Sequence, residues 1–186
     1  MPGRVPGIHV FLRHFAKEGV DGRDKLGHDG RHLTPPFILR PYKESDEDAA
    51  IALWCETWQQ AYPNIDFAAR VPWWRERWRS ELVPKAAIIV AEEAGALVGF
   101  VTIDVSAYLD QLVVAPGLWG SKLADVLVDE AKRLSPDRIT LLVNEDNARA
   151  IRFYQRNGFV HAGKDVNPTS GRPVLKMEWK SNAEPE

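Results

Sequence analysis

The sequence predicts an α+β domain in which helices flank a single, mostly antiparallel central sheet. Short, apolar, β-prone stretches alternate along the chain with longer stretches whose apolar residues recur at helical spacing. Two consecutive strands, 86–91 and 97–105, are separated only by a tight turn at 93–96, so they must run antiparallel. With 186 residues, of which 45% are apolar and 27% charged, the chain can form one ordinary domain with its own core.

The part of the chain before this hairpin is expected to form a strand and two helices. Residues 37–41 are apolar and β-prone, as in a short strand. A helix is expected from Ser45, which acidic residues follow, to Pro63, which ends it. A second helix is expected at about 66–82, where Pro72 is tolerated only in a first turn.

The part after the hairpin alternates strands with helices and closes with another hairpin. A strand at 108–114 leads into a helix at 121–134, whose apolar residues share one face. A strand at 139–143 leads into a helix that Gly158 ends. This helix is expected at 147–157. Two strands, at 159–162 and 174–179, are expected to follow it as the closing hairpin.

Composition and charge exclude several classes of protein. The formal net charge is −2, and residues 37–186 hold 18 basic and 22 acidic residues, which argues against a nucleic-acid partner. No run of about 18 apolar residues occurs, so no membrane span is expected. The single cysteine, Cys55, excludes an internal disulfide framework and a Cys-rich zinc module. We therefore expect a cytoplasmic protein without a nucleic-acid or membrane partner.

Residues 1–36 differ in composition from the rest of the chain. They contain four of the five histidines and six of the 13 glycines, and no helical or strand period extends beyond a few residues. The spacing of the histidines matches no metal-binding motif, so no metal site is expected. We expect 1–36 to be a disordered or artefactual N-terminal extension, and 37–186 to be the functional domain.

A strand, a short loop and a helix start follow one another between Leu112 and Leu127. The loop contains Pro116, Gly117 and Gly120. Unpaired backbone N–H groups and the positive end of the helix dipole make such a helix start a site for anions. An ordinary strand-to-helix turn has the same pattern, so this motif alone leaves both interpretations open.

A second motif, between 144 and 159, carries a more specific signal. It follows the pattern Asn-x-x-Ala-x-x-Phe-Tyr-x-x-x-Gly-Phe. Together with the first motif and the order of elements, it resembles the GNAT superfamily of N-acetyltransferases over about 37–180. The matching residues are Asn147, Ala150, Phe153, Tyr154, Gly158 and Phe159.

The first motif departs from the pattern of this superfamily at two positions. Trp119 stands where the family often has Gln or Arg, and Lys122 stands where a central glycine is expected. A positive φ at Lys122 would cost about 1 kcal/mol. Alternatively, its ammonium group contacts a phosphate, or the side chain points to solvent and only its N–H matters.

The resemblance implies acetyl-CoA as co-substrate and no metal. It implies that the backbone of 112–114 pairs with the pantetheine arm and polarises the thioester carbonyl, and that 120–124 holds the pyrophosphate. The residues it places at the co-substrate are Leu112, Val113, Val114, Trp119, Gly120, Ser121, Lys122, Leu123, Ala124, Asn147 and Tyr154.

Two residues are candidates for proton transfer. Tyr154 stands at the family's usual general-acid position and would protonate the departing thiolate, although a core tyrosine packing beside Phe153 would occupy the same place. Asp110 is expected to share a strand face with Leu112 and Val114, which suggests it as the general base. A solvated charge or a cap would also explain Asp110.

The acceptor is expected to be a primary amine, on a small molecule or a protein N-terminus, acetylated directly by a monomer or homodimer. Five of the seven tryptophans lie between 54 and 78, in the helices that usually shape the acceptor pocket of this superfamily. They either pack in the core or form an aromatic wall for the acceptor. A non-catalytic acyl-CoA-binding regulatory module on the same fold is the competing functional hypothesis.

Overall fold

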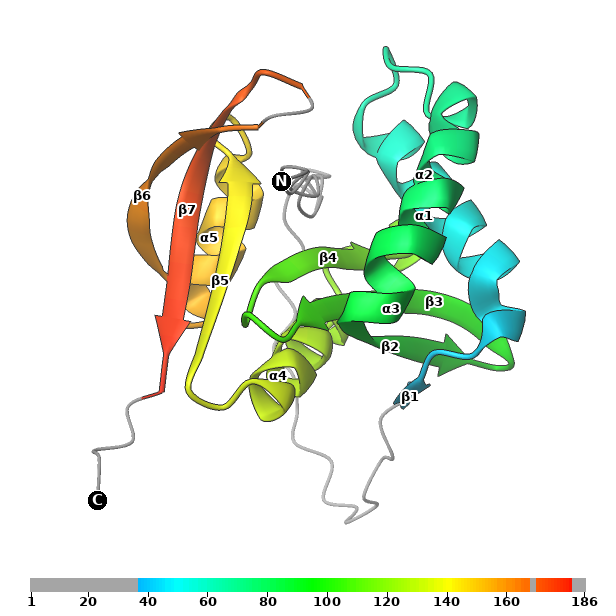
Figure 1. Cartoon of the computed structure of the whole chain (residues 1–186), viewed down its shortest axis with the longest axis horizontal. Helices are drawn as coiled ribbons and strands as arrows, with labels where there is room; N and C mark the ends of the chain where they lie inside the picture. The colour runs from blue at the N-terminus through cyan, green and yellow to red at the C-terminus, as the bar shows by residue number, and fades with distance from the viewer. Residues whose placement is uncertain (1–36, 168–169, 182–186) are drawn as a thin grey trace, which may run out of the picture.

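The computed structural model describes residues 37–167 and 170–181. The expected N-terminal extension, 1–36, lies outside these residues. Strands and helices follow one another in the predicted order, and the α+β class is confirmed (Figure 1).

Four strands form an antiparallel sheet in the order β1-β2-β3-β4. The turn between β2 and β3 has a positive φ at both Ala94 (50°) and Gly95 (81°). Two such residues give a hairpin turn whose twist matches that of the strands it joins. The strands are β1 (Ile38–Pro41), β2 (Ala86–Glu93), β3 (Ala96–Asp104) and β4 (Leu109–Val114).

The helix expected at 66–82 is divided into several short pieces. It starts with a 3-10 turn, continues as α2, passes through a π-helical turn at Trp78–Leu82 and ends as α3. No helix within the described part of the chain is long and apolar enough to cross a membrane. The helices are α1 (Glu47–Ala61), α2 (Val71–Arg77), α3 (Val83–Lys85), α4 (Leu123–Leu134) and α5 (Ala148–Arg156).

The predicted sheet continues past β4 as a second group of three antiparallel strands, β5 (Arg138–Asn144), β7 (Pro173–Lys180) and β6 (Val160–Val166), in that spatial order. The two groups meet at a parallel bridge between Tyr108 and Thr140. Beyond this bridge β4 and β5 diverge, as Figure 1 shows. Beyond the bridge no pairing of β4 with β5 is present among the described residues, and we call this unpaired side of β4 the gap.

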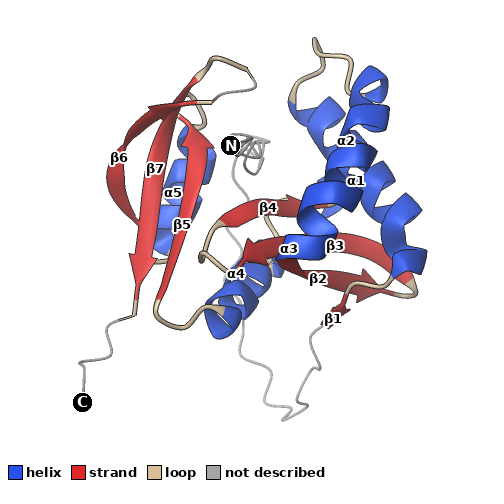
Figure 2. Ribbon diagram, viewed as in Figure 1, coloured by secondary structure: helices blue, strands red, loops and turns tan. Residues whose placement is uncertain are grey.

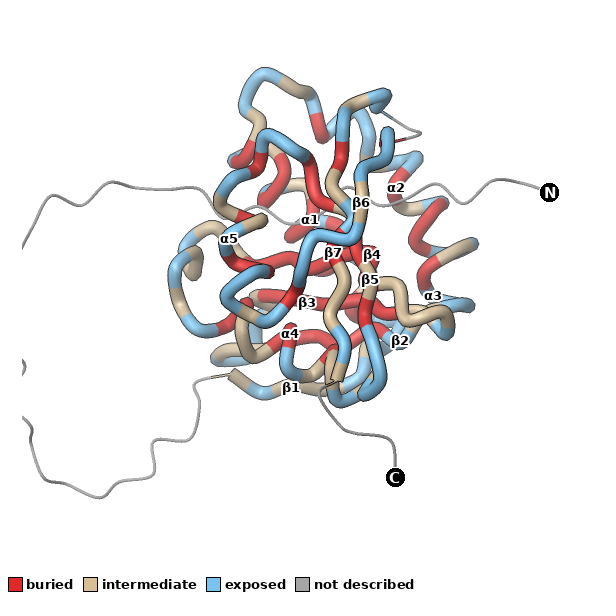
Figure 3. Tube along the Cα trace, turned by 90° about the vertical axis from the view of Figure 1, so that its left-hand side faces the viewer, coloured by how far each residue is buried: buried red, intermediate tan, exposed pale blue. Residues whose placement is uncertain are grey.

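Helices cover both faces of the first group of strands (Figure 2). The alternation of side chains along β2 shows this directly, because Ile88 and Val90 pack with α1 and α2, whereas Ile89 and Ala91 pack with α4. Helix α5 joins α4 in the second of these clusters, against β5 and β7. Figure 3 shows buried residues concentrated in β3, β4 and the helix faces that cover them, whereas β6 is mostly exposed.

A β-bulge at Asp110 changes the direction of side chains along β4. The pairing with β3 shifts by one residue at this point, so Asp110 has no residue opposite it. A bulge breaks the alternation of the strand. As a result, Asp110 faces α2, where it meets Arg77, whereas Leu112 and Val114 pack in the cluster with α4. The expectation that Asp110 shares a face with these two residues is wrong, because it assumed an uninterrupted strand.

Candidate active site

The loop between β4 and α4 is shaped by Gly120. Its φ is +91°, a left-handed conformation that residues with a Cβ rarely adopt. Nothing lies within 4 Å of the place where a Cβ would stand. The turn therefore needs glycine for its backbone conformation, and it leaves open space beside that backbone.

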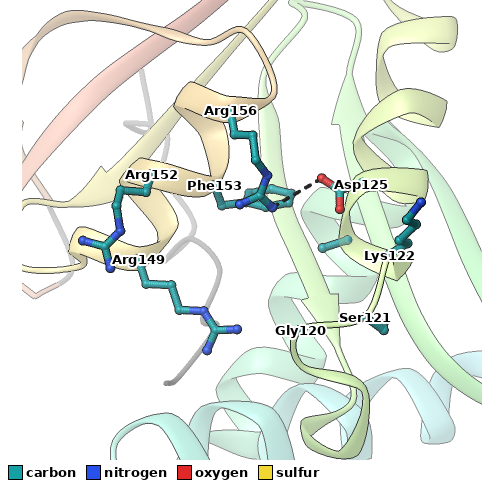
Figure 4. Close-up of a pocket in the computed structure, with 9 residues that line it drawn as sticks. Gly120, Ser121, Lys122, Asp125, Arg149, Arg152, Phe153 and Arg156 are labelled. Carbon is teal, nitrogen blue, oxygen red and sulfur yellow. Dashed lines mark ion pairs between the residues drawn. The ribbon is translucent and has the colours of Figure 1, made fainter. Parts of the chain in front are cut away.

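Lys122 adopts an ordinary helical conformation, with a φ of −79° and a ψ of −1°. The strain considered for a lysine at this position therefore does not arise, because the left-handed residue of the loop is Gly120. Figure 4 shows the Lys122 side chain directed away from Arg149 and Arg156. Since the side chain is also exposed, its backbone is the part that faces the loop.

The start of α4 presents backbone N–H groups beside this loop. Val126 donates to the carbonyl of Lys122 (3.0 Å), which opens the helical hydrogen-bonding pattern. The preceding amides of Ala124 and Asp125 have no helical carbonyl within reach, and that of Leu123 donates to Ser121 Oγ (3.2 Å). Together with the helix dipole, these amides make the start of α4 a place of positive potential beside the loop, and its use as an anion site stays a prediction.

A cavity of about 320 Å³ separates this loop from α5. On the side of α5 it is lined by Arg149, Arg152 and Arg156 (Figure 4). The sequence analysis missed these arginines. Their spacing of three and four residues places them on one face of the predicted helix 147–157, and this periodicity is the signal that could have found them.

The last residues of β4 turn their backbone groups alternately toward β3 and toward the gap. Ala115 donates to the carbonyl of Val98 (2.8 Å), so Val113, two residues earlier, also faces β3 in the antiparallel ladder. Leu112 and Val114 face the gap. Of the three strand residues expected at the pantetheine arm, the structure places these two beside the gap and pairs Val113 within the sheet.

The carbonyl of Val114 already has partners within the protein. Trp119 donates to it from Nε1 (2.9 Å), and Thr57 donates from Oγ1 (3.3 Å). The indole of Trp119 therefore ties the loop back to its strand. This bond gives a structural role to a residue that departs from the family's usual Gln or Arg.

Tyr154 combines a buried ring with an unsatisfied hydroxyl. The ring packs edge-on against Phe153 and Phe159, with 5.2 Å between ring centroids in each pair. Within the described part of the chain, the buried hydroxyl has no hydrogen-bond partner, which costs about 1–3 kcal/mol. Burial, and to a lesser degree Tyr108, raises the pKa of Tyr154 well above its ordinary value of 10.0. The hydroxyl is therefore protonated at neutral pH and can donate.

Asn147 fixes the start of α5. Its side-chain oxygen accepts a hydrogen bond from the N–H of Ala150 (3.1 Å), which caps the helix. The spacing of Asn and Ala in the second motif is thus the spacing of a helix cap. The cap sets where α5 begins and therefore where its arginines stand relative to the loop.

Asp110 is held in a buried ion pair. Its Oδ2 lies 2.9 Å from Nη2 of Arg77, and Arg77 Nε lies 3.3 Å from Glu81. The guanidinium also stacks over the ring of Trp74, 5.3 Å from its centroid. A solvated charge is therefore excluded as the explanation of Asp110, and its role as a base stays a prediction.

Four of the five tryptophans between 54 and 78 belong to the core. They are at most 3% exposed, which confirms core packing and excludes the aromatic wall for these four. Trp73 is 43% exposed. Two arginines of the same segment, Arg75 and Arg79, pair with Glu47. The four buried residues are Trp54, Trp58, Trp74 and Trp78.

The far end of the gap is bridged by a hydrogen bond between distant parts of the chain. Asn144, the last residue of β5, donates to the hydroxyl of Tyr62 after α1 (3.0 Å). Arg172 lies over the Tyr62 ring, 5.5 Å from its centroid. The end of α1 and the edge of the second group of strands therefore meet across the gap.

The site thus combines an amide-lined anion site, outward backbone groups on a strand, and a buried proton donor. Such an arrangement can hold a phosphate-bearing ligand at the start of α4 and an extended arm along β4. The buried hydroxyl of Tyr154 has a proton to donate, and its role as the acid stays a prediction.

Residues 47–159 match the model of the acetyltransferase (GNAT) family. Two proteins of Escherichia coli (strain K12) are similar over most of their length. Peptidyl-lysine N-acetyltransferase YiaC is 30% identical over 145 residues, which cover 76% of this chain and 96% of YiaC. Peptidyl-lysine N-acetyltransferase YjaB is 27% identical over 136 residues, which cover 73% of this chain and 90% of YjaB.

The fold is also similar to that of solved structures. The PaiA N-acetyltransferase of Thermoplasma acidophilum, crystallised in complex with coenzyme A, superposes with a TM-score of 0.63 at 21% sequence identity. The similarity covers 77% of this chain and 98% of that protein. It supports the arrangement of strands and helices described above.

Proposed function

The chain belongs to the acetyltransferase (GNAT) family, and we propose that it transfers an acetyl group from acetyl-CoA directly to a primary amine. The observation that carries this proposal is the buried Tyr154 hydroxyl, which has no hydrogen-bond partner among the described residues. It stands in the same packed cluster as Leu112 and Val114, whose backbone groups face the gap.

The residues of the site fit acetyl-CoA. A diphosphate requires donors and positive potential, and the amides at the start of α4 supply both beside a loop with room for a ligand. The pantetheine arm carries amide groups that can pair with an exposed strand, and Leu112 and Val114 turn their backbones to such a position. We propose that Gly120 to Ala124 hold the pyrophosphate and that these two strand residues hold the arm.

The protein's own groups would then control two protons. Acetyl-CoA supplies a thioester carbonyl that is open to attack by an amine. The hydroxyl of Tyr154 is protonated and has no hydrogen-bond partner among the described residues, so its proton can be given to the departing sulfur. Asp110 faces α2, on the side where the resemblance implies the acceptor, and its carboxylate lies 2.9 Å from Arg77. We therefore keep Asp110 as the proposed base, positioned by Arg77.

The acceptor class can be narrowed by experiment. YjaB and YiaC are named for peptidyl-lysine, so lysine side chains in peptides join small amines and protein N-termini as candidate acceptors. Buried tryptophans and paired arginines on α1 and α2 leave few groups there to select an acidic or aromatic acceptor. We propose a primary amine as the acceptor, with the lysine side chain of a peptide as the first candidate to test.

Release of free thiol from acetyl-CoA tests the proposal. The full chain is offered a lysine-containing peptide, the same peptide with only its N-terminal amine available, and small amines. Thiol release that depends on one of these amines, with acetylation found on it by mass spectrometry, supports the proposal. Tyr154→Phe is the control, because it keeps the ring and removes the proton.

The competing hypothesis is a non-catalytic acyl-CoA-binding module. It predicts the same binding of acetyl-CoA, no amine-dependent thiol release, and no effect of Tyr154→Phe on any functional readout. Amine-dependent release by the natural chain, lost in the variant, excludes it.

A further inference from the structure

Helix α5 directs three arginines to one side of the cavity described above. Arg149, Arg152 and Arg156 are separated by three and four residues, so they lie along one face of the helix. Of the described residues that line this cavity, Asp125 is the one acid. Three guanidinium groups and one carboxylate leave a strongly positive wall opposite the start of α4, which is positive as well.

The three arginines differ in what they contact. Arg156 lies 3.6 Å from Asp125 and stacks over Phe153, 5.5 Å from the ring centroid. Arg149 has its Nη1 buried and without a hydrogen-bond partner among the described residues. Burial, together with Arg152 and Arg156, lowers the pKa of Arg149. Neither Arg149 nor Arg152 has an ion-pair partner among the described residues, so an added anion would balance their charge.

The directions of these side chains separate two anion positions. Figure 4 shows Arg149 extended from α5 toward the loop at Gly120, whereas Arg152 points away from α4. The loop amides at the start of α4 are the proposed site of the diphosphate. A second phosphate that Arg152 reaches would lie on the side of Arg149 away from the loop, and therefore apart from a diphosphate held by the loop amides.

Coenzyme A has the chemistry for both positions, since it carries a diphosphate and a separate phosphomonoester on the 3′ oxygen of its ribose. A planar guanidinium can donate two parallel hydrogen bonds to such a phosphate. Resting on the proposed use of acetyl-CoA, we propose that Arg149 and Arg152 form a subsite for the 3′-phosphate, so that this chain selects coenzyme A over its 3′-dephospho form.

Calorimetric titration of the full chain with acetyl-CoA and with acetyl-3′-dephospho-CoA tests this selection. The natural chain is expected to bind acetyl-CoA at least about tenfold more tightly, because charge-assisted hydrogen bonds are lost with the phosphate. Arg152→Gln and Arg149→Gln are each expected to weaken the binding of acetyl-CoA by about the same factor. The binding of acetyl-3′-dephospho-CoA should be unchanged in both variants. Arg138→Gln, at an exposed arginine outside the cavity, is the matched control and should keep the ratio of the natural chain.

Two results would overturn the subsite. Equal affinity of the natural chain for both ligands would show that the 3′-phosphate is not recognised. Equal weakening of both ligands in the arginine variants would place these arginines at the diphosphate instead. If the natural chain bound neither ligand, the proposed function itself would fail, and the subsite with it. Arg149→Lys keeps the charge but loses the planar guanidinium. Its affinity for acetyl-CoA should therefore lie between that of the natural chain and that of Arg149→Gln.

Discussion

The guanidinium of Arg77 lies 2.9 Å from the carboxylate of Asp110, and their side chains are only 6% and 7% exposed. This pair joins α2 to the bulge in β4, two elements that also border the proposed acceptor side. Removing one member of a buried pair leaves the other charge without compensation. Removing only one member of the pair should therefore destabilise the fold whether or not Asp110 takes part in the reaction.

Asp110→Asn is expected to lower the free energy of unfolding by about 3–5 kcal/mol, since it leaves Arg77 as an uncompensated buried charge. Glu81, 3.3 Å from Arg77, offsets part of this loss. Denaturant unfolding measures the effect. The double variant Arg77→Met/Asp110→Leu replaces the pair by apolar groups and should recover most of the stability.

The same double variant separates stability from catalysis. This variant is expected to fold and to bind acetyl-CoA. If Asp110 is the base, its amine-dependent thiol release should fall by at least about 100-fold. Release at the rate of the natural chain would remove Asp110 from the mechanism and leave it as a structural residue.

Tyr154→Phe is expected to reduce turnover by about 100-fold or more while leaving the dissociation constant of acetyl-CoA within about twofold. The variant keeps the ring that packs against Phe153 and Phe159 and removes only the unsatisfied hydroxyl. Turnover is measured as thiol release and binding by calorimetry. Undiminished turnover would contradict the assignment of Tyr154 as the acid.

Stability at alkaline pH should also depend on Tyr154. Its pKa in the folded protein is raised above 10.0, so the folded state binds more protons than the unfolded state above pH 10.0. The contribution of Tyr154 to the free energy of unfolding is therefore fully present below pH 10.0. It is lost as the pH rises toward the raised pKa, by up to about 1.4 kcal/mol per pH unit. In Tyr154→Phe, the free energy of unfolding should therefore fall less steeply above pH 10.0, by up to this amount per pH unit. An unchanged slope would contradict the burial of the hydroxyl.

Gly120→Ala tests the left-handed turn of the phosphate loop. The substitution is expected to cost about 1–2 kcal/mol of stability, because φ at Gly120 is +91°. It should also weaken acetyl-CoA binding, since the loop must shift. Gly117→Ala is the matched control in the same loop. Its φ is not in the left-handed region and a Cβ there meets nothing within 4 Å, so it should be close to neutral in both measurements. Equal effects of the two variants would contradict the special role of Gly120.

The order of elements and the core helices could be predicted from the sequence, because apolar periodicity reports directly which faces are buried. The tryptophan stripes of α1 and α2 follow this rule. The left-handed position at Gly120 was also accessible, since glycine marks such turns. The packing of Tyr154 beside Phe153, which the sequence offered as the alternative to an acid, is present in the structure, since its ring is fully buried.

The bulge at Asp110 could not be predicted, because it depends on how β4 pairs with β3 and leaves no mark in the alternation of residue types. That single shift turned Asp110 from the face of Leu112 to the side of Arg77. The bond from Trp119 to Val114 was also inaccessible, since it joins a loop side chain to a backbone carbonyl. Tertiary geometry decides both features.

Calorimetric titration of acetyl-CoA into the full chain tests the central claim most directly. The account predicts one binding site per chain with a dissociation constant on the order of micromolar, weakened by Gly120→Ala and unaffected by Tyr154→Phe. No heat of binding from the natural chain, confirmed by the absence of a ligand-induced rise in melting temperature, would contradict the claim that this loop and strand form an acetyl-CoA site.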